Sequence, residues 1–235
     1  MAKTLGLIGG TGPESTIEYY RLLIAKYREL ADGNSPPLII NSINLKFMME
    51  WMTAGELQRV ADYLVAEIEK LRQAGADFGA LTANTPHIVF DELQRRSALP
   101  LISIVEATRD HVQSLGFETV ALFGTRFTMK GSFYPEVFSR TGVTLVTPND
   151  EEQTYIHAIY MGELLKDVFL PETRAKLLAI ADAMKTRDGI QAVILGGTEL
   201  PLLLRDQEHN GMALLDTTRI HVDRLITEML GTPDH

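Results

Sequence analysis

Four times along this chain, an apolar stretch runs directly into a short block of Gly, Thr, Asn or Glu that a helical pattern follows. These segments begin at Leu5, Phe78, Val120 and Ala192. Each places hydroxyl, amide or bare backbone groups at the end of a predicted strand, where the first N–H groups of a helix are unpaired and partially positive. In open α/β sheets, ligands bind at this edge. The pattern therefore predicts an α/β protein that binds a small anion at its strand ends.

Strand and helix patterns alternate along the whole chain. The segments 54–74 and 171–187 place apolar side chains at helical spacing on one face. Such alternation predicts right-handed crossovers and doubly wound, mostly parallel sheets. The predicted strands lie near residues 4–9, 38–44, 77–82, 100–104, 119–124, 143–147, 191–196 and 212–216.

The four strand-end segments form two pairs, which indicates a duplicated half. Those at Leu5 and Val120 each open a half, and those at Phe78 and Ala192 follow at a similar distance. We therefore expect two pseudo-symmetric α/β domains with parallel sheets and an active-site cleft between them. The expected first half is 1–98 plus 207–235, because we expect the last strand and helix to return to it, and the second half is 99–206.

Composition excludes several classes of function. The 235 residues carry a formal net charge of −9, which opposes the field of a nucleic-acid backbone, so no nucleic-acid partner is expected. No apolar run approaches the roughly 18 to 20 residues that span a bilayer, and the first apolar stretch ends too early for a signal peptide. We therefore expect a cytoplasmic protein without membrane contact. With no cysteine and only scattered histidines, no metal site is expected.

The first strand-end turn contains a partial dinucleotide motif. Gly10 and Gly12 supply G-x-G, but Ser15 stands where the third glycine belongs and no acidic residue ends the second strand. A nucleotide cofactor is therefore not predicted. Two interpretations of Thr11 remain: it caps a helix that begins near Pro13, or with Gly10 it binds a small anion.

The second strand-end turn offers a hydroxyl, an amide and an imidazole. Asn84 and Thr85 can hold a carboxylate or carbonyl oxygen, and Thr82 lies directly before them. His87 is either a general acid or base or a structural hydrogen-bonding residue at a helix start.

The second half repeats this chemistry. Thr125, Thr128 and Thr198 offer hydroxyls, and residues 216–218 (Asp-Thr-Thr) predict a helix cap after the last strand. Glu199 either caps a helix or acts as a base, and the second role requires burial that raises its pKa.

The segments 7–16, 84–87, 123–129, 195–199 and 216–221 occur in the order, and with the residues, of a known family. Over nearly the whole chain they resemble the aspartate/glutamate racemases of the Asp/Glu/hydantoin racemase superfamily, which work without pyridoxal phosphate. The resemblance implies two α/β domains, a small amino acid or dicarboxylate as ligand, no cofactor, and a homodimer.

The resemblance also implies a pair of catalytic cysteines, and their positions here are Ala83 and Gly197. Losing one positioned base costs ~10² to 10⁴-fold in rate, so racemisation by two thiols is not expected. One alternative is an enzyme, a racemase-like isomerase or a lyase, that uses Thr82, His87 or Glu199. Another is a catalytically inactive binding or sensor protein, and a third is removal of both cysteines by engineering. If the binding frame is intact, cysteine at both positions should raise racemase activity.

Overall fold

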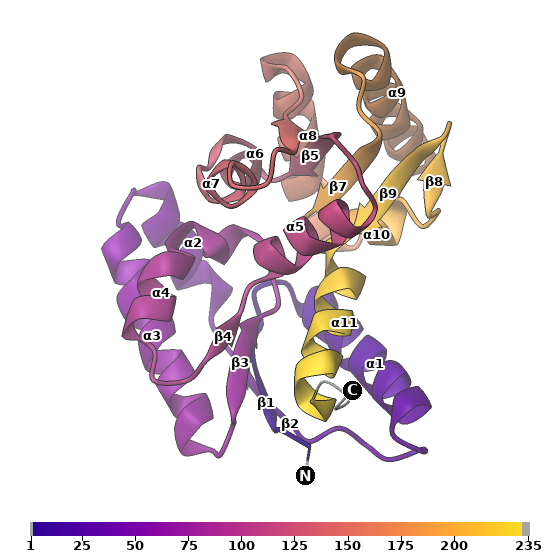
Figure 1. Ribbon diagram of the computed structural model, residues 1–235. Coiled ribbons are helices and arrows are strands. Elements are labelled where there is room, and N and C mark those ends of the chain that lie inside the picture. Colours follow the sequence, from indigo (N-terminus) through magenta and orange to yellow (C-terminus); the bar gives the residue numbers. More distant parts are fainter. Residues whose placement is uncertain (1, 232–235) are drawn as a thin grey trace. The chain divides into compact units, whose positions relative to one another are not determined.

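Each half of the chain forms one mostly parallel sheet with helices packed on it (Figure 1). The structure is a computed structural model that describes residues 2–231. The chain divides into two units: unit 1 runs to Ile104 and resumes at His221, and unit 2 is Val105–Ile220. The prediction of an α/β fold with two parallel sheets is confirmed.

Unit 1 has a four-stranded parallel sheet in the order β2-β1-β3-β4. Its strands are β1 (Leu5–Gly9), β2 (Leu38–Ser42), β3 (Phe78–Leu81) and β4 (Leu101–Ile102). Its helices are α1 (Pro13–Leu30), α2 (Leu45–Thr53), α3 (Leu57–Gln73), the short 3-10 helix η1 (Thr85–Val89), α4 (Phe90–Arg96) and most of α11 (Thr217–Leu230).

Unit 2 has five strands in the order β6-β5-β7-β9-β8, of which only β8 is antiparallel to its neighbour. Its strands are β5 (Thr119–Gly124), β6 (Thr144–Val146), β7 (Ala192–Gly196), β8 (Glu208–His209) and β9 (Met212–Asp216). Its helices are α5 (Ile104–Ser114), α6 (Arg126–Lys130), α7 (Phe133–Phe138), α8 (Asp150–Gly162), the 3-10 helix η2 (Leu164–Lys166), α9 (Pro171–Asp188) and α10 (Leu200–Leu203).

The two sheets share one topology, which confirms the predicted duplication. In each, the second parallel strand lies at one edge, followed by the first, the third and the fourth. All eight predicted strands are present. The short strand β8 was not predicted, and it pairs with β9 across a two-residue turn. That turn is Asn210-Gly211, with both φ angles positive (49° and 70°), and Asn-Gly is the usual signal of a tight hairpin.

The expected return of residues 207–235 to the first half is wrong for the strand. β9 pairs in parallel with β7, with Ala213 opposite Ala192 and Asp216 opposite Leu195. It is the fourth strand of the duplicated half and the counterpart of β4, so its hydrogen-bond partners lie in the second sheet. Only α11 returns, from His221 on, and the first crossing follows Ile104 rather than residue 98 because β4 still pairs with β3.

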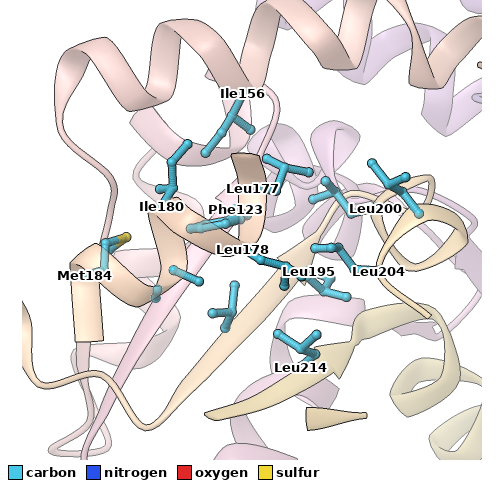
Figure 2. Packing of buried hydrophobic residues seen from close by; sticks show 14 of the residues in the cluster. Phe123, Ile156, Leu177, Leu178, Ile180, Met184, Leu195, Leu200, Leu204 and Leu214 are labelled. Atoms are coloured by element: carbon cyan, nitrogen blue, oxygen red, sulfur yellow. The ribbon is translucent and has the colours of Figure 1, made fainter. Parts of the chain in front are cut away.

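In unit 1, one face of the sheet packs against the first and the last helix (Figure 1). Buried Leu5, Leu7 and Phe78 of the strands contact the apolar faces of α1 and α11. In unit 2, Phe123 and Leu195 project into a core that α8, α9 and α10 complete (Figure 2). None of the helices in residues 2–231 combines the length and the hydropathy that a membrane span requires.

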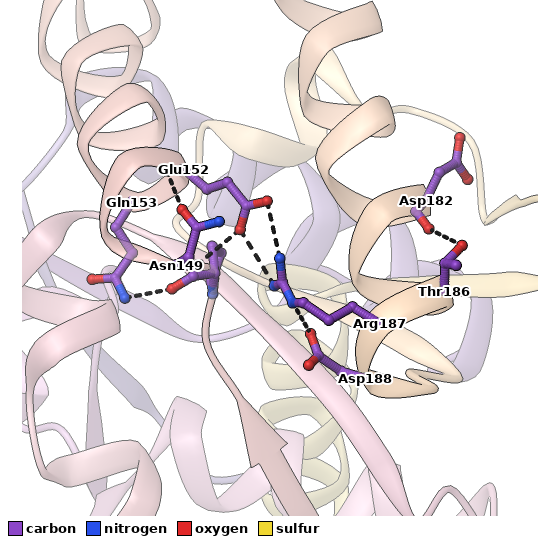
Figure 3. Close-up of polar contacts among 8 residues, drawn as sticks. Asn149, Glu152, Gln153, Asp182, Thr186, Arg187 and Asp188 are labelled. Atoms are coloured by element: carbon purple, nitrogen blue, oxygen red, sulfur yellow. Dashed lines mark hydrogen bonds and ion pairs between the residues drawn. The ribbon is translucent and has the colours of Figure 1, made fainter.

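The start of α8 is fixed by a reciprocal cap (Figure 3). Asn149 accepts a hydrogen bond from the Glu152 N–H at 3.0 Å, and the Glu152 carboxylate accepts one from the Asn149 N–H at 2.8 Å. Arg187, near the end of α9, donates to the same carboxylate at 3.3 Å. A capping box satisfies two otherwise unpaired N–H groups, so the first turn of α8 has a fixed position. This matters because Tyr160 lies on the same helix.

Candidate active site

The predicted residues of the first half gather at the carboxyl edge of the unit 1 sheet. β1 and β3 are neighbours, so the turns that follow them meet. Ser15 Oγ donates to the Thr82 carbonyl at 2.6 Å, and Thr82 Oγ1 donates to the Ile8 carbonyl at 3.1 Å. The Thr82 hydroxyl therefore already has a backbone acceptor.

Gly10 allows the first turn to pass close to the end of β2. Its φ is +77°, and a Cβ there would lie 2.5 Å from the Ile43 carbonyl oxygen. Its N–H donates to Thr16 Oγ1 at 2.9 Å. Only glycine fits both the angle and the space.

Thr11 does not cap α1, so that interpretation is wrong. The N-cap position is Gly12, which has no side chain, and Pro13 begins the helix as predicted. The Thr11 hydroxyl is buried and, among the described residues, has no hydrogen-bond partner. Anion binding at Thr11 and Gly10 remains a prediction.

The turn after β3 is buried. Ala83 is 8% exposed and Asn84 is 2% exposed, while Thr85, which begins η1, is half-buried. The methyl group of Ala83 has no exchangeable proton, so position 83 contributes no acid or base.

His87 has the contacts of a structural residue. Its Nδ1–H donates to the Ala83 carbonyl at 3.0 Å, and its Nε2 accepts the Ile104 N–H at 3.3 Å. Both ring nitrogens are therefore used by the backbone in one neutral tautomer. Burial lowers the pKa of His87 to about 4. Of the two interpretations, these contacts support the structural one.

His221, which the sequence analysis did not single out, makes the matching contacts from α11. Its Nδ1 accepts the Tyr19 hydroxyl at 2.8 Å, and its Nε2–H donates to the Ile102 carbonyl at 3.1 Å. Burial, with a smaller contribution from nearby His87, lowers its pKa to about 3. The two histidines thus hold the segment 102–104, where the chain leaves unit 1 for α5.

The carboxyl edge of the unit 2 sheet is built from the ends of β5 and β7, which are parallel neighbours. Thr125 caps α6: its Oγ1 accepts the Thr128 N–H at 3.3 Å and lies 3.2 Å from Thr128 Oγ1. Asp216 caps α11 by accepting the Thr218 N–H at 2.9 Å, which confirms the predicted cap.

Glu199 is 4% exposed and is the N-cap residue of α10, but its side chain makes no capping hydrogen bond, so the interpretation that the carboxylate caps the helix is wrong. Its carboxylate accepts hydrogen bonds from the Tyr160 hydroxyl and, at 3.1 Å, from Thr198 Oγ1. Burial raises the pKa of Glu199, and the two hydroxyls oppose that rise. The burial that a base role requires is therefore present.

Tyr160 occupies the space that a side chain at position 197 would need. A Cβ built on Gly197 would lie 2.5 Å from both Oη and Cε2 of Tyr160 and 2.8 Å from Cζ. Tyr160 belongs to the core under α8 and is 4% exposed. The Tyr160 hydroxyl therefore lies beside Gly197 and donates a hydrogen bond to Glu199 from there.

The chain matches the Asp/Glu/hydantoin racemase family model over residues 8–225, and it belongs to that family. A proposed Asp/Glu racemase from Yersinia pestis is 30% identical, with a TM-score of 0.89 over 97% of this chain and 100% of that one. An aspartate racemase homologue from Pyrococcus horikoshii OT3 is 34% identical, with a TM-score of 0.82 and the same coverage.

Among curated proteins, the broad specificity amino-acid racemase RacX of Bacillus subtilis (strain 168) is 26% identical over 153 residues. That segment is 63% of this chain and 66% of RacX. The resemblance stated from the motifs is therefore confirmed, and the chain is a member of an isomerase family that includes amino-acid racemases. The assignment of Ala83 and Gly197 to the cysteine positions stays a prediction.

Proposed function

We propose that this protein is a racemase-like enzyme that removes and returns the α-proton of a small amino acid without a cofactor. Membership of a racemase family supports this reaction class. The observation that carries the proposal is the hydrogen bond between buried Glu199 and the Tyr160 hydroxyl. It places a proton-carrying group beside Gly197, which has no side chain of its own to carry a proton.

The ligand we propose is an amino acid or dicarboxylate. Asn84 and Thr85 of unit 1 and Thr125, Thr128 and Thr198 of unit 2 supply amide and hydroxyl groups of the kind that hold carboxylates. Asn84→Ala should weaken ligand binding at least tenfold, because it removes both the donors and the acceptor of a buried amide. The matched control is Asn34→Ala, an exposed asparagine of the same unit.

Two experiments test this function. The first incubates the protein in D₂O with each enantiomer of aspartate, glutamate and several neutral amino acids, and follows the α-proton by ¹H NMR. The second measures binding of the same compounds by calorimetry. Binding without exchange would support the second candidate, an inactive carboxylate sensor, which the absence of cysteine favours. Absence of both would refute an amino-acid function.

The remaining properties that we propose follow from the family resemblance, from the net charge and from the short apolar runs of the sequence. They are action without pyridoxal phosphate, a homodimer, a cytoplasmic location and no nucleic-acid partner. Light scattering coupled to size-exclusion chromatography tests the oligomeric state, and activity of protein freed of pyridoxal phosphate tests the first.

A further inference from the structure

We propose that Tyr160 and Glu199 form a proton-transfer pair at the carboxyl edge of the unit 2 sheet, in place of the side chain absent at Gly197. The inference rests on the proposed function. It assigns part of the chemistry to Tyr160, which does not belong to any of the four strand-end segments. Tyr160 reaches this edge from α8, whereas Glu199 follows β7.

The place of the phenol oxygen supports this role. A cysteine at residue 197 would project its sulfur from a Cβ that lies 2.5 Å from Tyr160 Oη. The phenol oxygen therefore lies in the region where a side-chain group from position 197 would stand. Tyr160 substitutes for that side chain in space and supplies a hydroxyl with an exchangeable proton.

Connectivity argues for it second. The Tyr160 hydroxyl donates to Glu199 Oε2, and Thr198 Oγ1 donates to the same oxygen at 3.1 Å. A phenol bonded to a carboxylate can accept a proton on its oxygen while it passes its own proton on. A packing residue would need only the ring, and phenylalanine would serve.

The proposed step balances as follows. The Cα–H bond of the bound amino acid breaks, its proton goes to Tyr160 Oη, and the Tyr160 proton goes to the Glu199 carboxylate. The electron pair stays on the substrate as a carbanion conjugated with its carboxyl group. The reverse path returns a proton to the same face, or a deuteron once the pair has exchanged with D₂O.

This arrangement is one-sided. At the unit 1 edge, Ala83 has only a methyl group, the Thr82 hydroxyl donates to the Ile8 carbonyl, and both nitrogens of His87 bind backbone. A pair that acts on one face removes and restores the proton without inversion. We therefore expect α-proton exchange of one enantiomer to outrun racemisation at least tenfold.

The test compares three variants with the wild type in D₂O. Tyr160→Phe should lower the exchange rate at least 100-fold, and so should Glu199→Gln, which keeps the size and an acceptor oxygen but cannot take up a proton. The control is Tyr134→Phe, since Tyr134 is a fully buried tyrosine of the same unit whose hydroxyl bonds Thr108 instead. It should change the rate less than threefold. Circular dichroism establishes that each variant folds, and Glu199→Gln carries the test alone if Tyr160→Phe does not fold.

The outcomes separate the two proposals. Wild-type exchange that survives in Tyr160→Phe or Glu199→Gln within threefold overturns the pair and leaves the proposed function standing. A wild type that exchanges no α-proton refutes the proposed function and the pair with it. Inversion as fast as exchange, measured by chiral chromatography, overturns the one-sided step.

Discussion

Replacing Gly197 by alanine tests whether Tyr160 really fills the space beside residue 197. The added Cβ would lie 2.5 to 2.8 Å from three atoms at the hydroxyl end of Tyr160. Carbon atoms normally approach to about 3.5 to 4.0 Å, so the ring must shift by about 1 Å. Gly197 has no positive φ, and the cost is therefore steric rather than conformational.

Two contributions set the magnitude. Overpacking a dense core costs ~1 to 3 kcal/mol. Moving the Tyr160 hydroxyl away from Glu199 weakens a buried hydrogen bond, which costs a further ~1 to 3 kcal/mol. The expected loss of unfolding free energy is ~2 to 6 kcal/mol, or roughly 5 to 20 °C in Tm for a chain of this size.

Urea denaturation of the wild type, Gly197→Ala, Tyr160→Leu and the double variant measures the coupling between the two positions. Leucine removes the ring atoms that the new Cβ would meet, so Gly197→Ala should cost less than ~1 kcal/mol in that background. The control is Gly162→Ala on the same helix as Tyr160, where an added Cβ meets no atom within 4 Å. A Gly197→Ala penalty below ~0.5 kcal/mol, or an equal penalty in both backgrounds, would refute the reasoning. For the same steric reason, restoring cysteine at 83 and 197 together also requires a smaller residue at 160.

Two further predictions concern unit 1. In the folded protein the pKa of His87 is about 4 and that of His221 about 3, whereas an unperturbed histidine has a pKa of 6.5. Below pH 6.5 these two side chains therefore bind protons more readily in the unfolded chain. Their contribution to stability is complete above pH 6.5 and decreases as pH falls, by ~2 kcal/mol for each histidine at pH 5; urea midpoints that stay constant from pH 7 to 5 would contradict this. Since the family resemblance implies a catalytic side chain at position 83, Ala83→Cys should raise the rate of inversion of the substrate, measurable by chiral chromatography; a variant that folds and exchanges the α-proton but inverts no faster than the wild type would count against a catalytic position at residue 83.

Local patterns predicted most of the framework. The apolar runs at Leu5, Val120 and Ala192 each became a fully buried or nearly buried parallel strand, because both faces of these strands are covered. The cap at Asp216 was also predictable, because aspartate directly before a helical stretch is a preferred N-cap residue. Such features depend on neighbours within a few positions.

The features that the sequence did not show depend on distant partners. Tyr160 lies on the buried stripe of α8 with Gln153 and Ile156, so its spacing indicates only a core residue. Its relation to Gly197 and Glu199 arises from packing between elements about 40 positions apart. The sequence offered one sign of this relation: Gly197 stands where the family resemblance implies a cysteine, so the space of that side chain is left for another residue. Likewise, the neutral state of His87 comes from burial, and its tautomer is set by the Ala83 carbonyl and the Ile104 N–H; no periodicity shows either.

The late return of the chain to unit 1 has a consequence for biosynthesis. Unit 2 is continuous from Val105 to Ile220, so all of its strands exist before the last helix is made. Unit 1 instead needs Val222, Leu225, Ile226 and Met229 of α11 to cover Leu5 and Leu7, and the Met229 carbonyl accepts the Lys3 N–H at 2.9 Å. The first unit to leave the ribosome is therefore the last to complete its core, and it exposes an apolar sheet face throughout elongation. Loss of the final turns of α11 would therefore destabilise unit 1, which contains the first strands of the chain, more than unit 2.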